Sequence, residues 1–145
     1  MTDRASLAEN LLLAGARHAS APTVYLRDCR PIRPQPGQTR VLGYVLSIAG
    51  SALGDFDLGG IAFVWRAAPR DYPRAQTSGA GNGHADHVTV DVRADLGGVE
   101  LAEVLFHEVM HAAQLASGRW HTMTRQAREE EAVRFAASAM RGELL

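Results

Sequence analysis

The stretch VLFHEVMHAAQLASG, residues 104–118, decides how this chain folds. On a helical wheel at about 100° per residue, residues 99–116 separate into a broad apolar arc and a narrow polar stripe. The pattern predicts one amphipathic helix over residues 98–117, which ends at Gly118. The apolar arc contains Leu101, Ala102, Leu105, Phe106, Val109, Ala112, Ala113 and Ala116, and the polar stripe contains Glu100, Glu103, His107, His111 and Gln114.

Two histidines of the polar stripe have the spacing of metal ligands. His107 and His111 are four residues apart, so their imidazoles project side by side, one turn apart. Two nitrogens in this arrangement can each reach one Zn²⁺ at about 2.0–2.1 Å. Glu108 lies about a quarter-turn to the side, where it can take a proton from a water activated by the metal. The five residues HEVMH form the HExxH pattern of zinc hydrolases.

Two other interpretations of this helix are possible. A polar stripe opposite an apolar arc is also what an ordinary surface helix shows, with Glu103 and His107 as an i, i+4 pair. A metal could also bind here without catalysis, in a regulatory or scaffold module. We expect a metal site, because the motif falls inside a strongly predicted helix that directly follows a predicted strand.

Catalytic zinc usually has three protein ligands, so a third is needed. A histidine six residues beyond the second is excluded, because Ser117 stands there. Cys29 does not match the cysteine motif of peptide deformylases. The remaining source is a helix predicted over residues 124–141, which ends at Gly142 and contains three consecutive glutamates. Glu129 falls within the apolar face of that helix, where a carboxylate needs a partner, and Glu131 lies near its edge. We expect Glu129 to be the third metal ligand, with Glu131 as the alternative.

HEVMH followed eighteen residues after His111 by EEEAVRFA resembles the gluzincin zinc metallopeptidases, and among them the small ImmA/IrrE-like peptidases. Their second motif has a glutamate ligand and a downstream Ala-Asp/Asn pair. The resemblance covers about 30 residues and departs at Val133, where an Asp or Asn often orients a ligating histidine. It implies a zincin-like fold, a Zn²⁺ cofactor and peptide-bond hydrolysis. The residues that match are Glu129, Ala132, Phe135 and Ala136.

The resemblance also implies a substrate-binding strand and a donor for the developing oxyanion. Residues 87–93 alternate apolar and polar side chains, and we expect a half-exposed edge strand there, which either pairs with a peptide or protein substrate or is an ordinary edge strand. His121 is the first candidate donor. Tyr72, His84 and His87 are the others. A protein partner, or a long polar loop expected over 69–86, is expected to complete the cleft.

Composition fits one soluble domain that spans residues 1–145. The net charge is −1 and no basic block occurs, so nucleic acid is not an expected partner. The N-terminus lacks a secretory signal and no window is apolar enough to span a membrane, so we expect a cytoplasmic protein without a membrane partner. A single cysteine, Cys29, excludes an internal disulfide; its basic flanks allow a reactive thiol or an ordinary one.

The remaining chain predicts an α+β domain with a small mixed sheet, an active-site helix and a C-terminal helix. We expect a first helix over residues 5–17 and a loop over 30–38, where prolines remove hydrogen-bond donors. Runs of β-branched and aromatic residues predict strands over 23–28, 40–50, 60–67 and 87–95.

Overall fold

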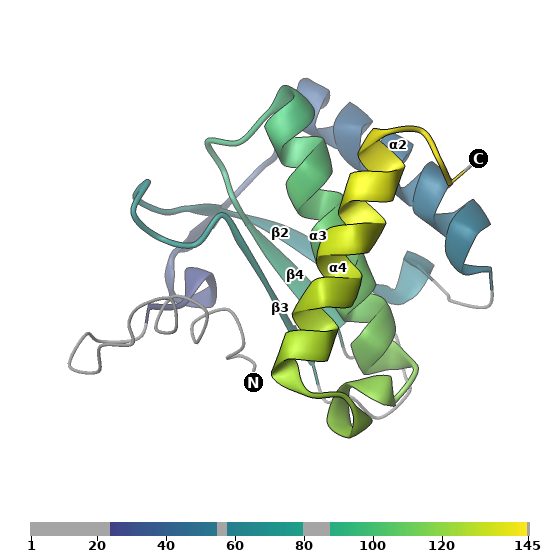
Figure 1. Cartoon of the computed structure of the whole chain (residues 1–145). Helices are drawn as coiled ribbons and strands as arrows, with labels where there is room; N and C mark the ends of the chain where they lie inside the picture. Colours follow the sequence, from purple (N-terminus) through teal and green to yellow (C-terminus); the bar gives the residue numbers. More distant parts are fainter. Residues whose placement is uncertain (1–23, 55–57, 80–87, 145) are drawn as a thin grey trace.

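The computed structural model describes residues 24–54, 58–79 and 88–144, and its architecture is α+β (Figure 1). This confirms the predicted class. The predicted helix over residues 5–17 lies outside the described residues. In chain order, the described elements are the 3₁₀ turn η2 (Leu26–Asp28), β1 (Arg30–Ile32), α2 (Pro36–Leu53), η3 (Leu58–Gly60), β2 (Ala62–Ala67), β3 (Ala75–Gly79), β4 (Val88–Arg93), α3 (Gly98–Ala116), η5 (Arg119–Thr122) and α4 (Arg125–Met140).

The described strands form a mixed sheet with the order β1-β2-β4-β3. β2 and β4 run parallel, whereas β1 pairs antiparallel with β2 and β3 pairs antiparallel with β4. The register sets Val92 opposite both Trp65 and Ala75, and all three are buried. Because side chains alternate along a strand, Thr77 shares their face of the sheet.

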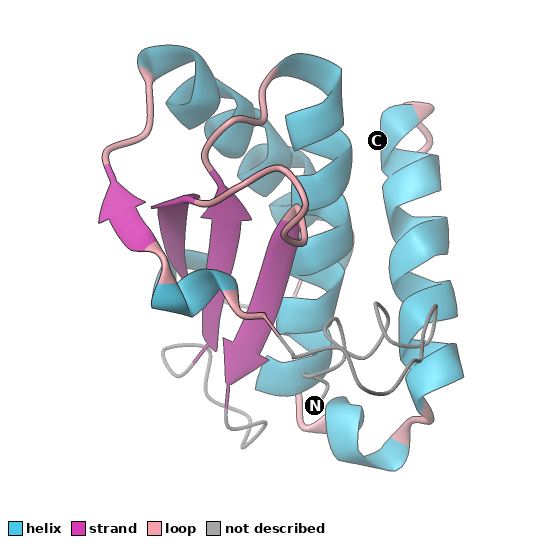
Figure 2. Ribbon diagram, turned by 90° about the vertical axis from the view of Figure 1, so that its left-hand side faces the viewer, coloured by secondary structure: helices cyan, strands magenta, loops and turns pink. Residues whose placement is uncertain are grey.

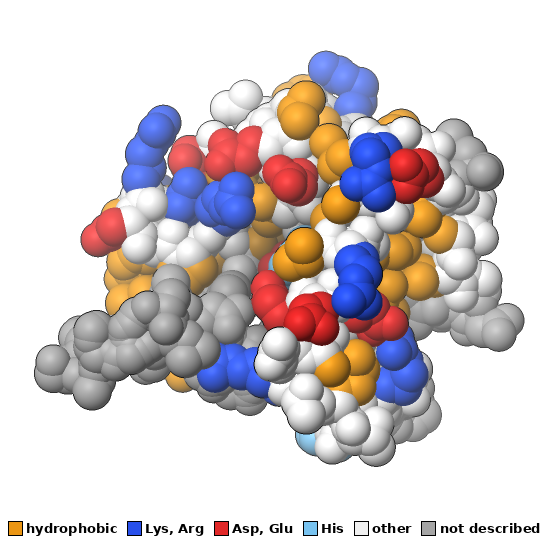
Figure 3. Space-filling model, in the orientation of Figure 1, with side chains coloured by type: hydrophobic (Ala, Val, Ile, Leu, Met, Phe, Trp, Pro, Cys, Tyr) orange, Lys and Arg blue, Asp and Glu red, His pale blue; other side chains and the backbone are white. Residues whose placement is uncertain are grey.

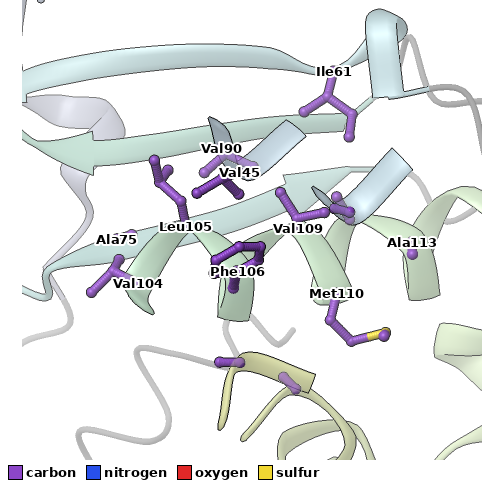
Figure 4. Close-up of a cluster of buried hydrophobic side chains, with 14 of the residues drawn as sticks. Val45, Ile61, Ala75, Val90, Val104, Leu105, Phe106, Val109, Met110 and Ala113 are labelled. Carbon is purple, nitrogen blue, oxygen red and sulfur yellow. The ribbon is translucent and has the colours of Figure 1, made fainter. Parts of the chain in front are cut away.

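Helix α3 packs between the sheet and α4, as both ribbon views show (Figures 1 and 2). Its apolar arc is buried, and it meets the valines of β4 in the core (Figure 4). Phe106 has no solvent exposure, and its ring makes edge-on contacts with Tyr44 of α2 at 6.3 Å and Phe135 of α4 at 6.2 Å. The aromatic contacts join all three described helices around one residue of the deciding stretch.

The predicted strand over 87–95 is confirmed as β4, but the expectation of a half-exposed edge is wrong. β4 lies inside the sheet, between β2 and β3. Its second face is also covered, because Asp91 is 3% exposed and pairs with Arg66 at 2.8 Å. The turn η2 packs against this face, and its Leu26 N–H donates to Gln76 of β3. The polar residue Asp91 in the alternating pattern of β4 is therefore explained by its ion pair with Arg66 and not by exposure to solvent.

The expectation of a strand over 40–50 is also wrong, because these residues belong to helix α2. Pro36 opens the helix, and the side chains of Gln35 and Gln38 cap its first turn reciprocally. Val45 and Ala49, four residues apart, are buried against the core. The β-branched residues indicated a strand, but a buried stripe at helical spacing stabilises the helix.

Three shorter expectations need correction as well. Residues 24–28 form an irregular segment and a 3₁₀ turn instead of a strand. The loop expected over 30–38 contains β1 and the start of α2. The long loop expected over 69–86 contains β3, and residues 80–87 lie outside the described part. Strand β3 carries few β-branched residues, so tertiary pairing with β4 stabilises it.

The strand over 60–67 and the two C-terminal helices are confirmed with near-exact boundaries. Both helices end where a glycine adopts a left-handed conformation, Gly118 with φ 79° and Gly142 with φ 74°. Thr124 caps the start of α4 by accepting from the Ala127 N–H. No helix among the described residues is long and apolar enough to cross a membrane.

Candidate metal centre

Helices α3 and α4 bring His107, His111 and Glu129 together. Nε2 of His107 lies 2.9 Å from Glu129 Oε2, and Nε2 of His111 lies 3.1 Å from Glu129 Oε1. The two imidazole rings meet edge to face with their centroids 4.8 Å apart. The three residues can each offer one ligand atom, and these atoms all lie within 4.8 Å of one another. The expected contact between the motif helix and the three-glutamate run is therefore present.

The cluster lies at a partly buried interface between α3 and α4, with His111 as its buried member. His111 is 5% exposed and its ring packs edge-on against Trp120 of η5, at 5.6 Å between centroids. The guanidinium of Arg128 stacks on the Trp120 ring, 4.1 Å from its centroid, and donates to the Trp120 carbonyl. The polar stripe of the wheel is therefore covered along its C-terminal half by α4 and η5.

Charges within the cluster compensate each other. Burial opposes the charged carboxylate of Glu129, but hydrogen bonds from His107 and His111 outweigh it and hold its pKa well below the ordinary value. Burial likewise opposes an imidazolium at His111, yet its contacts with Glu129 and the charge of Glu108 raise its pKa above the ordinary value. The same carboxylate that favours a proton on His111 would favour a cation bound by the cluster.

The structure separates Glu129 from Glu131. Glu131 does not join the cluster; its carboxylate accepts from Arg119 at 3.1 Å and from the side-chain amide of Gln114 at 2.9 Å. Glu130 points to solvent and pairs with Arg134, four residues on, at 3.9 Å. Each of the three consecutive glutamates thus has a different partner, and only Glu129 reaches the imidazoles.

Glu108 is 5% exposed and is held by the sheet. The hydroxyl of Thr77 donates to Glu108 Oε1 at 2.6 Å and lies 3.3 Å from the Glu108 carbonyl. Thr77 reaches it because β3 presents this side chain to α3. The sequence offered no signal for this contact, since β3 itself was not predicted.

A cavity of about 510 Å³ opens over the cluster. Its walls contain the motif residues His107 and Glu108, the α4 residues Glu129 and Val133, and the loop residues Tyr72, Pro73 and Arg74. The buried guanidinium of Arg93 donates to the backbone carbonyls of Arg70 and Tyr72, which anchors that loop. The cavity therefore brings together two of the candidate ligands, His107 and Glu129, with the carboxylate of Glu108 and with Tyr72.

The candidate oxyanion donors have different locations. Tyr72 lines this cavity. His121 lies exposed on η5 and is not among the residues that line it. His84 and His87 lie outside the described residues. Of the donors expected from the sequence, the described structure brings only Tyr72 to the cavity.

Two other features do not share this chemistry. A larger cavity of about 960 Å³ lies between α2 and the start of α3, and its lining includes Tyr44, Val99 and Met140 but no histidine. Cys29 lines neither cavity, and burial, with Asp28 beside it, raises the pKa of its thiol. A raised pKa is the opposite of what a reactive thiol requires.

Acidic side chains gather over the N-terminal half of α4 and near the start of α3, with arginines between them (Figure 3).

The donor set of the cluster, two imidazoles and a carboxylate, suits Zn²⁺ and other divalent transition metals. The spacing of its ligand atoms allows one ion to contact all three residues. The residues therefore fit a metal ion, and their chemistry does not by itself choose zinc.

No family model, curated protein or solved structure matches this chain.

Proposed function

We propose that this chain is a zinc-dependent peptidase with a zincin-like fold. In this proposal His107, His111 and Glu129 bind Zn²⁺, and Glu108 is the general base. The observation that carries it is the meeting of three ligand atoms within 4.8 Å, beside a fourth side chain, Glu108, that lines a cavity with His107 and Glu129. Metal ligands alone would not require that carboxylate.

The arrangement of the sheet supports a peptide as the substrate. β3 is an edge of the described sheet, and its Thr77 contacts Glu108. An extended peptide paired with β3 would run along the cavity and present a carbonyl to the cluster. The substrate-binding strand that we expected over 87–93 is thereby moved to residues 75–79, because β4 has strands on both sides.

The chain's own residues supply most of the chemistry. When bound, Zn²⁺ would act as a Lewis acid that acidifies water and polarises a carbonyl. Glu108 takes the proton of the attacking water and passes it to the leaving amine. Thr77 holds one carboxylate oxygen of Glu108, which leaves the other oxygen for the water. The hydroxyl of Tyr72 donates to the oxyanion that forms at the substrate carbonyl.

Metal analysis and peptide cleavage test the proposal together. Protein purified without added zinc should contain about one equivalent of metal per chain, and the loaded protein should cleave an unstructured peptide mixture. E108Q should retain the metal and lose cleavage. E100Q is the matched control, because Glu100 is an exposed residue of the same helix that pairs with Arg74. It should retain both properties.

The same experiment distinguishes a binding module from an enzyme. A chain that binds zinc stoichiometrically but cleaves no peptide, with or without Glu108, would be a zinc-binding regulatory or scaffold module. A chain that takes up no metal, even when zinc is supplied in excess, would contradict both functions.

A further inference from the structure

Gln114 bridges the two helices of the cluster and contacts one of its histidines. Its side chain has no solvent exposure. The amide nitrogen Nε2 donates to the backbone carbonyl of Arg128 at 3.1 Å and to Glu131 Oε1 at 2.9 Å. The amide oxygen Oε1 lies 2.9 Å from Nδ1 of His111.

These partners determine which way the amide faces. A backbone carbonyl and a carboxylate can only accept hydrogen bonds, so the end of the amide that faces them must be the NH₂ group. Arg119 donates to both oxygens of Glu131 and holds that carboxylate in place. The opposite end of the amide, facing His111, is therefore the carbonyl oxygen.

The amide orientation in turn determines the proton on His111. A carbonyl oxygen has no proton to donate, so a favourable contact at 2.9 Å requires a proton on Nδ1 of His111. Nδ1 is thereby committed to Gln114, and Nε2 is the ring nitrogen that faces Glu129. Without a metal ion Nε2 donates its own proton to the Glu129 carboxylate, and it is the nitrogen whose lone pair can bind a metal ion that displaces this proton.

We propose that Gln114 is a positioning residue that keeps a proton on Nδ1 of His111 and thereby presents Nε2 to a metal ion. The proposal rests on the metal site of the proposed function. Glu131, the alternative ligand, serves as the anchor of Gln114.

Zinc affinity tests this assignment, measured by competition with a chromogenic chelator. Q114L removes both ends of the amide and should weaken zinc binding by about 10-fold to 100-fold. Q114E/E131Q exchanges the two groups: a carboxylate accepts from Nδ1, and the new amide at 131 donates to it. This double variant should recover an affinity within a few-fold of the original chain. Q126L is the matched control, since Gln126 is an exposed α4 residue whose side-chain amide donates to Glu130.

The double variant separates positioning from packing. Both variants lose the bond to the Arg128 carbonyl, so both should unfold at a lower temperature in the metal-free state. A purely structural role predicts that both also lose zinc affinity to the same extent. That result, or an unchanged affinity in Q114L, would overturn the proposal.

A second measurement does not depend on metal. In metal-free protein with ¹⁵N-labelled histidine, long-range proton–nitrogen correlation spectra should show a protonated, slowly exchanging Nδ1 on His111, and Q114L should lose the slow exchange. A bare Nδ1 in the folded chain would refute the assignment, whatever the zinc result. A protonated Nδ1 in a chain that binds no zinc would support the proton assignment while the peptidase proposal fails.

Discussion

The hydroxyl of Thr77 lies 2.6 Å from Oε1 of Glu108 and joins the edge strand to the motif helix across 31 positions of sequence. A hydrogen bond to a charged group contributes about 1.5–3 kcal/mol. It also restricts the rotamers of a carboxylate that, in the proposed function, meets a water molecule. Thr77 therefore determines where the proposed general base lies.

Replacing Thr77 should reduce turnover without releasing metal. T77V removes the hydroxyl but keeps the shape of the side chain, and we expect kcat to fall on the order of tenfold. T77S restores the hydroxyl and should recover most of the activity. Steady-state kinetics with metal content measured on the same samples checks this; metal loss in T77V would show that Thr77 acts on the ligands instead.

The three consecutive glutamates should differ sharply in their effect on metal binding. E129Q removes a ligand and should lower zinc affinity by at least about 100-fold, because two imidazoles remain. E130Q changes an exposed residue whose side chain faces Arg134 and Gln126, and should have no effect. Isothermal titration with zinc measures both variants. Equal affinities in the two would exclude Glu129 as the ligand.

The metal-free chain should depend on pH through the same cluster. The lowered pKa of Glu129 contributes stability above about pH 4.5, which is lost as the pH falls toward the folded-state pKa. The raised pKa of His111 contributes stability that is complete below about pH 6.5 and is lost as the pH rises through the folded-state value.

The difference in unfolding free energy between the original chain and E129Q should therefore be largest between these two pH values and smaller in alkaline solution. Urea unfolding of chelator-treated protein measures this difference at about pH 5.5 and about pH 8.5, one value on each side of the histidine transition. A difference that grows with pH would contradict the ion pairs.

Tyr72 should matter more for turnover than His121. The phenol lines the cavity, whereas His121 is exposed on η5. Loss of one oxyanion donor costs about 100-fold to 1,000-fold in kcat, so we expect Y72F to approach this range with little change in KM. The comparison variant is H121A. A larger loss in H121A than in Y72F would return the donor role to His121.

The aromatic junction at Phe106 should dominate the stability of the helix layer. F106A removes a fully buried ring that contacts Tyr44 and Phe135, and should cost about 3–5 kcal/mol. V99A is the control at the exposed start of α3, where Val99 is 73% exposed, and should change stability by less than about 0.5 kcal/mol. Chemical denaturation of both variants checks the contrast.

Local patterns were reliable where one physical signal was strong. Helices α3 and α4 follow from an apolar stripe at helical spacing and from glycines that end each helix. The segment of α2 shows how such signals conflict. Its β-branched residues favoured a strand, while Pro36 and the burial of Val45 and Ala49 stabilise a helix. Gln114 stands three residues after His111, so the sequence placed the two side chains near each other on the helix. The same spacing occurs on any solvent-exposed polar stripe, and the sequence alone did not indicate their contact.

The sequence by itself determined the α+β class, the motif helix, the spacing of His107 and His111, and a short list of third partners for them. These depend on contacts within one helix, where positions three and four apart are neighbours. Only the tertiary structure decided between Glu129 and Glu131, placed β3 at the edge, and brought Thr77 to Glu108. Those outcomes depend on how α4 and β3 pack against α3, and the packing of separate elements depends on burial across the whole core, which no single segment encodes.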